Sequence, residues 1–289
     1  MRKNQSVTDF FQAVRQEPNK YHRLPKLEGE PNKIEIIQQL KTYQLDSISG
    51  IRKYSYQLAH QIGQLQHDTL LKQTIVNFLL QGFHDKDTGI CGIVSDLLKE
   101  YPPAFYSNNA RSQILELLPM APPYYSELIK LAGYIHPQSA PLLLEELLAS
   151  RVIKRNTDRW AAHLALARMN DKTSISYCVQ QIKKQEVDDD LVYDVLPDLI
   201  YTHQRESIDY LIELLNSDEK NCETADPESD VKITCAYRVM EYLVPVIRNF
   251  PLHLNASGDV NTEDYREALL IAREWFLQNP NYQIIRDQY

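Results

Sequence analysis

The chain has 289 residues, of which 43% are hydrophobic and 24% are charged, and its formal net charge is −8. A chain of this length buries enough apolar surface to fold without disulfides or metals, and its apolar content excludes general disorder. Only 8 residues are glycine, and no apolar run approaches the roughly 18 residues of a membrane helix, so collagen-like and membrane-spanning classes are excluded.

The first residues carry two basic side chains, but the apolar stretch of a signal peptide does not follow them, so we expect a cytoplasmic protein. A secreted protein whose leader has been removed is the alternative. Cys91 and Cys178 lie in apolar helical patterns and are expected to be reduced and buried. Cys222 and Cys235 flank a polar loop and are expected to stay reduced, with a cross-link between them as the alternative in an oxidising compartment.

Apolar residues recur at helical spacing from Lys33 almost to the end of the chain, whereas sustained alternation and hairpin turn pairs are missing. Residues 1–31 are polar and interrupted by prolines, which predicts one short helix near 6–16 and irregular chain after it. The spacing predicts further helices near 33–44, 51–65, 69–82, 89–100, 105–118, 123–134, 138–149, 157–169, 173–184, 189–201, 205–216, 230–249 and 262–278.

Helix boundaries carry their own signals. Proline inside a helical pattern removes a backbone donor, so Pro197 and Pro245 predict kinks or breaks. Side chains that accept hydrogen bonds from the first helical N–H groups mark the starts of helices. The candidates are Asp68, Asn156, Asp188, and either Asn261 or Thr262.

A period of 34 and then 33 residues relates the helices in the middle of the chain. Three sets of positions repeat at this spacing: Ile135, Met169 and Thr202; Leu144, Cys178 and Leu211; Leu148, Ile182 and Leu215. Self-similarity at this period predicts helical hairpins that bury their apolar faces by stacking on one another. The positions expected to be buried between hairpins are Leu131, Leu144, Leu148, Leu166, Ile182 and Leu211.

Residues 159–171 resemble the first helix and turn of a HEAT-like repeat, with weaker copies at 135–140 and 202–207. The matching positions are Arg159, Ala162, Ala165, Leu166, Met169 and Asp171, and Asn170 stands in the place of the family's glycine. The resemblance implies an all-α, right-handed α-α superhelix of about six hairpins, a solenoid. It would form a single domain over 32–289 after an irregular segment at 1–31. Such a resemblance is specific for fold and not for function.

Charge is unevenly distributed. Residues 151–184 hold eight Lys or Arg and two Asp or Glu, whereas residues 185–230 hold two Lys or Arg and fifteen Asp or Glu. The loop at 216–230 is longer than the other connections, and long loops in compact arrays are often functional or disordered. A solvated acidic insertion and a docking site for a basic partner both fit this pattern, and the spacing of a calcium loop is missing.

Two sets of residues are candidates for partner binding. The resemblance implies that the second helix of each hairpin lines a concave face, which would place Glu145, Glu146, Gln180, Gln181, Lys184 and Glu213 there. The acidic loop contributes Asp218, Glu219, Glu223, Asp226 and Glu228. Arg155, Arg159 and Trp160 form a basic and aromatic corner that would either hold an anion or nucleobase or pack between hairpins.

Motifs for nucleotide binding, for nucleophilic hydrolysis and for metal coordination are missing from the sequence. We therefore expect a non-catalytic protein–protein interaction scaffold with no catalytic residue, cofactor or metal, whose partner is a protein with a basic surface. The acidic balance disfavours nucleic acid, and no membrane association is expected. The alternative from another class is a HEAT-like enzyme acting on nucleic acid, like a DNA glycosylase, or on a prosthetic group, like a bilin lyase.

Overall fold

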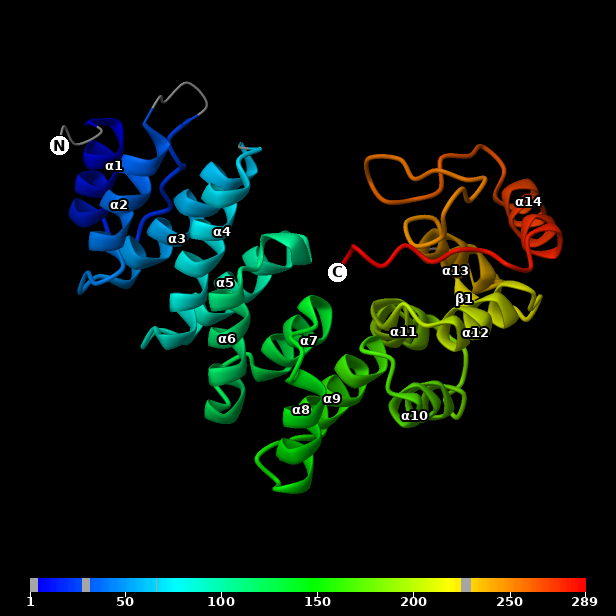
Figure 1. Ribbon diagram of the computed structural model, residues 1–289. Coiled ribbons are helices and arrows are strands. Elements are labelled where there is room, and N and C mark those ends of the chain that lie inside the picture. The colour runs from blue at the N-terminus through cyan, green and yellow to red at the C-terminus, as the bar shows by residue number, and fades with distance from the viewer. Residues whose placement is uncertain (1–4, 28–31, 66, 225–229) are drawn as a thin grey trace. The chain divides into compact units, whose positions relative to one another are not determined.

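A computed structural model describes residues 5–27, 32–65, 67–224 and 230–289 of the chain (Figure 1). The chain forms two compact units, Met1–Asp158 and Arg159–Tyr289. Most of the described residues are helical, which confirms the all-α class, and the strands among them are limited to one two-residue pair. In this part of the chain no helix has both the length and the apolar character needed to cross a membrane.

The first unit consists of helices in two contacting layers. In one layer α3 contacts α5 and α5 contacts α7, and in the other α2 contacts α4 and α4 contacts α6. The helices are α1 (Gln5–Gln16), α2 (Lys33–Tyr43), α3 (Ser49–Gln64), α4 (Thr69–Leu80), α5 (Thr88–Lys99), α6 (Asn108–Leu117), α7 (Tyr125–Ile135) and α8 (Ala140–Ala149). Short 3-10 turns follow α4, precede α6 and follow α6, at Gln81–His84, Pro103–Phe105 and Leu118–Met120. Asp68 caps α4 as predicted, because its carboxylate accepts the N–H of Leu71 at 2.8 Å.

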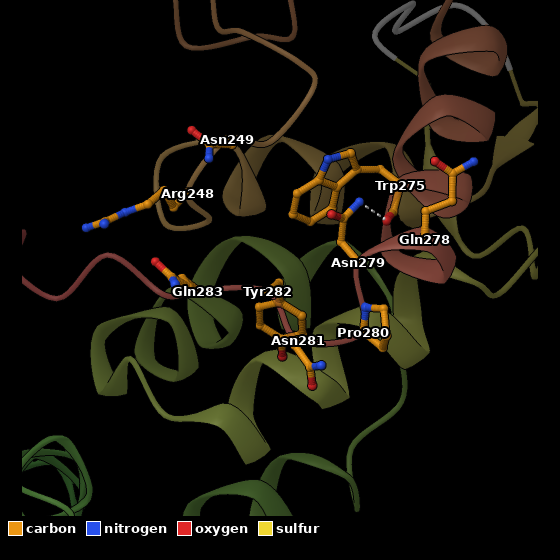
Figure 2. A pocket seen from close by; sticks show the side chains of 9 residues that line it. All are labelled: Arg248, Asn249, Trp275, Gln278, Asn279, Pro280, Asn281, Tyr282 and Gln283. Carbon is orange, nitrogen blue, oxygen red and sulfur yellow. Dashed lines mark hydrogen bonds between the residues drawn. The ribbon is translucent and has the colours of Figure 1, made fainter.

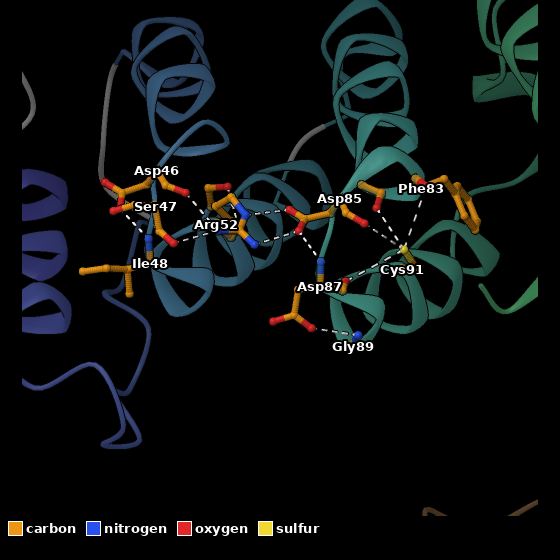
Figure 3. Close-up of polar contacts among 11 residues, drawn as sticks. Asp46, Ser47, Ile48, Arg52, Phe83, Asp85, Asp87, Gly89 and Cys91 are labelled. Carbon is orange, nitrogen blue, oxygen red and sulfur yellow. Dashed lines mark hydrogen bonds and ion pairs between the residues drawn. The ribbon is translucent and has the colours of Figure 1, made fainter. Parts of the chain in front are cut away.

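A buried arginine joins the start of α3 to the turn before α5 (Figure 3). The Nε and Nη2 atoms of Arg52 each donate to the Asp85 carboxylate at 2.8 Å, and its Nη1 donates to the carbonyls of Asp46 and Ser47. The two side chains are only 5% and 4% exposed. Burial alone would raise the pKa of Asp85, but hydrogen bonds from Arg52 and from the Asp87 N–H hold that pKa below its ordinary value.

The second unit is also helical. Its elements are α9 (Asn156–Arg168), which begins at the end of the first unit, α10 (Lys172–Ile182), a π-helical turn (Leu191–Val195), α11 (Leu196–Thr202), α12 (Arg205–Leu215), β1 (Cys222–Glu223), β2 (Lys232–Ile233), α13 (Ala236–Leu243) and α14 (Tyr265–Gln278). Helix α12 contacts α10, α11, α13 and α14, and therefore lies at the centre of the unit.

Three helices are followed by a residue in the left-handed backbone conformation. His136, Asn170 and His203 follow the ends of α7, α9 and α11, and their φ angles are 48°, 72° and 48°. This left-handed conformation is the one that glycine adopts most readily at a helix C-terminus. Three non-glycine residues therefore occupy equivalent turn positions, 34 and 33 residues apart.

Two predicted helix boundaries need correction. The helix expected at 230–249 is replaced by β2 and by α13, which ends at Leu243, two residues before Pro245. The cap of α14 is Asp264, whose carboxylate accepts the N–H groups of Arg266 and Glu267 at 2.8 and 3.3 Å. Thr262 accepts the N–H of Asp264 instead, so it stabilises the turn before the cap. The predicted break at Pro197 coincides with the change from the π-helical turn to α11.

The C-terminal segment 279–289 packs across the second unit. Ile284 pairs with Ile247, and the Ile285 N–H donates to the Val246 carbonyl at 2.8 Å. Arg168, which is 9% exposed, donates to the carbonyls of Arg286 and Gln288. These backbone contacts hold the segment against the unit, although its side chains after Tyr282 are exposed or half-buried.

Candidate functional site

Cys222 and Cys235 form a disulfide across the β1–β2 hairpin, with their Cα atoms 5.1 Å apart. The antiparallel strands pair Cys222 with Ile233 and Glu223 with Lys232, which brings the two cysteines into bridging range. The expectation of reduced thiols is therefore wrong for this pair. Cys91 and Cys178 are free and buried as predicted, and burial raises the pKa of the Cys178 thiol to about 12.

Arg273 of α14 anchors the start of this hairpin. Its guanidinium donates to the Leu215 carbonyl at 2.8 Å, to the Ser217 carbonyl at 3.1 Å and to the Asp218 carboxylate at 2.8 Å. On the other side Asp189 accepts the Glu223 N–H at 2.8 Å. The described ends of the acidic loop are thus fixed by the disulfide, by strand pairing and by two charged side chains.

Most of the described carboxylates in 185–230 have partners within the protein. Asp218 pairs with Arg273, Glu223 with Lys232, Glu213 with Lys183, Glu206 with Lys172 and Asp209 with Arg205. By contrast, the exposed side chains of Glu186, Asp190, Asp194 and Glu219 have no hydrogen bond or ion pair with any described residue. Asp226 and Glu228, two of the predicted site residues, lie outside the described residues.

Cations also surround the hairpin. A cleft of 550 Å³ beside it is lined by Lys220, Lys232, Arg266 and Arg273, with Asp218 as its carboxylate. Asp218 and Glu223 of the loop are therefore neutralised locally, whereas Glu219 is not. Unpaired negative charge is concentrated instead at 186–194, between α10 and α11, next to the half-exposed ring of Tyr193.

The structure brings together only part of the set predicted for a concave face. Gln180 and Lys184 are exposed at the end of α10 and in the turn after it, Gln181 is half-buried, and the neighbouring Lys183 reaches Glu213 of α12 at 2.5 Å. Glu145 and Glu146 are exposed on α8, which belongs to the first unit. Of the predicted concave-face residues, the structure therefore brings together only those at the end of α10 and on α12.

The basic and aromatic corner is held by internal contacts. Arg155 makes a bidentate ion pair with the buried Asp158 at 2.7 and 2.9 Å. The Trp160 indole N–H donates to the Asp198 carboxylate of α11, and the ring lies 6.3 Å from that of Tyr177. Trp160 thus packs among α9, α10 and α11, while Arg159 is exposed.

His203 is a buried ionisable group that the sequence pattern did not single out. It is 2% exposed, and its ring lies against the backbone of Ile285 in the C-terminal segment. Burial, and secondarily the positive charge of Arg168, lower the pKa of His203 to about 3. Its helix-end position in the repeat was visible from the sequence, but the segment that buries it lies about 80 residues away.

This shift predicts a pH-dependent loss of stability in the second unit. The pKa of His203 in the folded state is below the unfolded value of about 6.5. Neutral His203 therefore contributes its full stabilisation above pH 6.5, and this stabilisation is lost as the pH falls toward 3. Between pH 7.5 and 5 we expect the wild type to lose about 2 kcal/mol more unfolding free energy than His203→Asn. Asn keeps the left-handed turn, as Asn170 does at the equivalent position. Urea unfolding at both pH values measures the difference, and equal losses would contradict the assignment.

Comparison of the chain with protein-family models, with curated proteins and with solved structures finds no match in any of the three. Among the described residues, no group of three or more His, Cys, Asp or Glu side chains is arranged to hold a metal ion.

Proposed function

We propose that the protein is an interaction scaffold that binds a basic protein surface through an acidic surface made of Glu186, Asp190, Asp194 and Glu219. The observation that supports it is that these four exposed carboxylates have no partner within the described chain, although most of their neighbours do. A basic partner would supply the missing counter-charges. Facing potentials of opposite sign raise association rates and fix orientation.

Rigidity supports the same proposal. Glu219 follows Asp218, which Arg273 holds. Asp190 precedes and Asp194 lies within a π-helical turn whose Leu191 and Val192 are buried. A surface that is already ordered loses less conformational entropy on binding than a flexible acidic loop would lose.

The finer fold assignment is part of this proposal. We propose that the hairpins are HEAT-like and follow a right-handed superhelical path. The two helix layers of the first unit and the left-handed residues at His136, Asn170 and His203 support the repeat. In this reading the second helix of each hairpin lines an inner face, and Glu145 and Glu146 provide a second candidate surface.

Charge neutralisation tests the acidic surface. The protein is immobilised, and binding proteins from an extract of its source cells are compared for the wild type and two variants. One variant carries Glu186→Gln, Asp190→Asn, Asp194→Asn and Glu219→Gln. The matched control neutralises four exposed carboxylates elsewhere: Glu35, Glu116, Glu263 and Glu267.

We expect the wild type and the control to retain a protein that the acidic-surface variant does not retain. That protein should elute at about 1 M salt, because the electrostatic screening length there is only about 3 Å. Its association rate at low salt should fall by about tenfold or more in the variant. Equal retention by all three proteins would contradict this choice of surface.

A further inference from the structure

A pocket of 390 Å³ lies at the C-terminal end of α14 in the second unit (Figure 2). Two segments form it: the turn at Arg248 and Asn249 after α13, and the stretch from Trp275 to Gln283 that ends α14 and begins the C-terminal segment. Figure 2 shows the indole of Trp275 above the side chain of Asn279, with Arg248 and Gln283 at the other side of the view. Neither segment contributes to the acidic surface.

An ordered aromatic cluster supports the pocket. The Trp275 ring lies 5.4 Å from Phe250 and 5.2 Å from Phe276, and Phe276 lies 5.4 Å from Tyr282. Tyr282 is fixed in turn, because its hydroxyl donates to Asp209 at 2.7 Å and the Arg205 guanidinium lies 3.9 Å from its ring centroid. Trp275 is half-buried, so a rigid indole presents part of its apolar surface to the pocket.

Carboxamides dominate the polar lining. The Asn279 amide donates to the Trp275 carbonyl at 2.8 Å, and the Gln278 amide donates to the Glu274 carboxylate at 2.8 Å. The side chains of Asn249, Asn281 and Gln283 make no hydrogen bond to any residue that the structure describes. Each carboxamide both donates and accepts hydrogen bonds, which matches the dual character of a hydroxyl group.

The electrostatics of the pocket disfavour an anion. The pocket lies at the carbonyl end of α14, where the helix dipole is negative. Arg248 is the one cation of its lining, and no carboxylate belongs to the lining. A neutral ligand that is rich in hydroxyl groups and has one apolar face satisfies the helix end, the amides and the indole together.

We propose that this pocket binds a neutral saccharide, one of whose sugar rings stacks its C–H face on Trp275 while its hydroxyl groups pair with Asn249, Asn281 and Gln283. The volume lies within the range of small-ligand pockets and accommodates one or two sugar rings. This proposal is independent of the acidic surface, because the two sites share no residue.

Tryptophan fluorescence provides the first test. The chain has two tryptophans, so Trp160→Phe leaves Trp275 as the single reporter. The probes are maltotriose, cellotriose, chitotriose and mannotriose, with adenine as a planar ligand that has no hydroxyl groups. We expect at least one trisaccharide to give a saturable change with a dissociation constant of about 1 mM or below, and adenine to give none.

Calorimetry with the responding trisaccharide then assigns the site. Trp275→Ala is expected to weaken binding by about tenfold or more, and Asn281→Ala with Gln283→Ala by a similar factor. Leu270→Ala is the matched control on α14, since Leu270 is 64% exposed and lies outside the pocket. If Trp275→Ala does not fold, the double amide variant decides. No saturable response to any trisaccharide, a response to adenine alone, or undiminished binding by the pocket variants would each overturn the proposal.

Discussion

Replacing Arg52 with alanine is expected to lower the free energy of unfolding by about 3–5 kcal/mol, because it leaves a buried charge without its partner. Asp85 is 4% exposed and receives both of its charged hydrogen bonds from Arg52. The carbonyls of Asp46 and Ser47 lose their donor at the same time. The variant therefore unlinks the start of α3 from the turn before α5.

Urea unfolding measures the loss, and an exposed ion pair with nearly the same sequence separation is the control. Lys172 and Glu206 form a 3.4 Å pair whose side chains are 77% and 49% exposed. Lys172→Ala should cost less than about 1 kcal/mol, since water and ions screen such a pair. A loss at Arg52 no larger than the loss at Lys172 would show that the buried pair does not hold the turn.

The pH dependence of the Arg52 effect follows from the lowered pKa of Asp85. A carboxyl whose folded pKa is depressed contributes stability above its unfolded pKa, and that contribution is lost as the pH falls below this value. In the folded variant, burial without Arg52 raises the pKa of Asp85, so the difference between the wild type and Arg52→Ala should begin to shrink above the ordinary carboxyl pKa of about 4 and shrink further as the pH falls. A constant difference down to pH 3 would mean that the arginine acts only through the two carbonyls.

The features that sequence reasoning predicted are those set by neighbouring residues. Helical spacing depends on residues within one or two turns, so the helices from α2 to α10 and α12 were predicted to within a few residues, whereas the helix predicted at 189–201 is divided into a π-helical turn and α11. The Asp68 cap and the break at Pro197 are equally local. Asn170, which stands in the place of the glycine of the HEAT-like pattern, has the left-handed conformation that glycine adopts readily.

The features that were missed depend on contacts between distant segments. Arg52 and Asp85 are 33 residues apart, and neither lies in a motif that marks it as paired. The disulfide requires a hairpin of two-residue strands, which is too short to produce an alternating pattern. His203 is buried in a unit whose C-terminal segment returns across α11 and α12 from some 80 residues away. The sequence likewise could not show which carboxylates of the acidic segment are neutralised, because their partners Arg273 and Lys232 come from other elements.

Helix α8 shows how far the repeat period determines the core. Five of the six residues predicted to be buried are buried, but Leu148 is half-buried and Leu147 faces the core instead. The 34-residue spacing aligns helices to the nearest turn. Leu147 and Leu148 lie three and four residues after the buried Leu144, so both are near its face, and the orientation of α8 decides which of them is more deeply buried. Periodicity therefore predicts which helices pack together better than it predicts which side chains point inward.

Leu166 provides the test of that packing in the second unit. It lies on α9, is 2% exposed, and belongs to the segment that resembles a HEAT-like repeat. Leu166→Ala should lower the free energy of unfolding by about 2–5 kcal/mol, because it removes buried apolar surface and leaves a cavity that rigid helices fill only in part. Leu277→Ala, at a side chain that is 82% exposed on α14, should change it by less than about 0.5 kcal/mol. Urea unfolding followed by circular dichroism separates the two, and a loss at Leu166 below about 0.5 kcal/mol would mean that α9 packs in a different register.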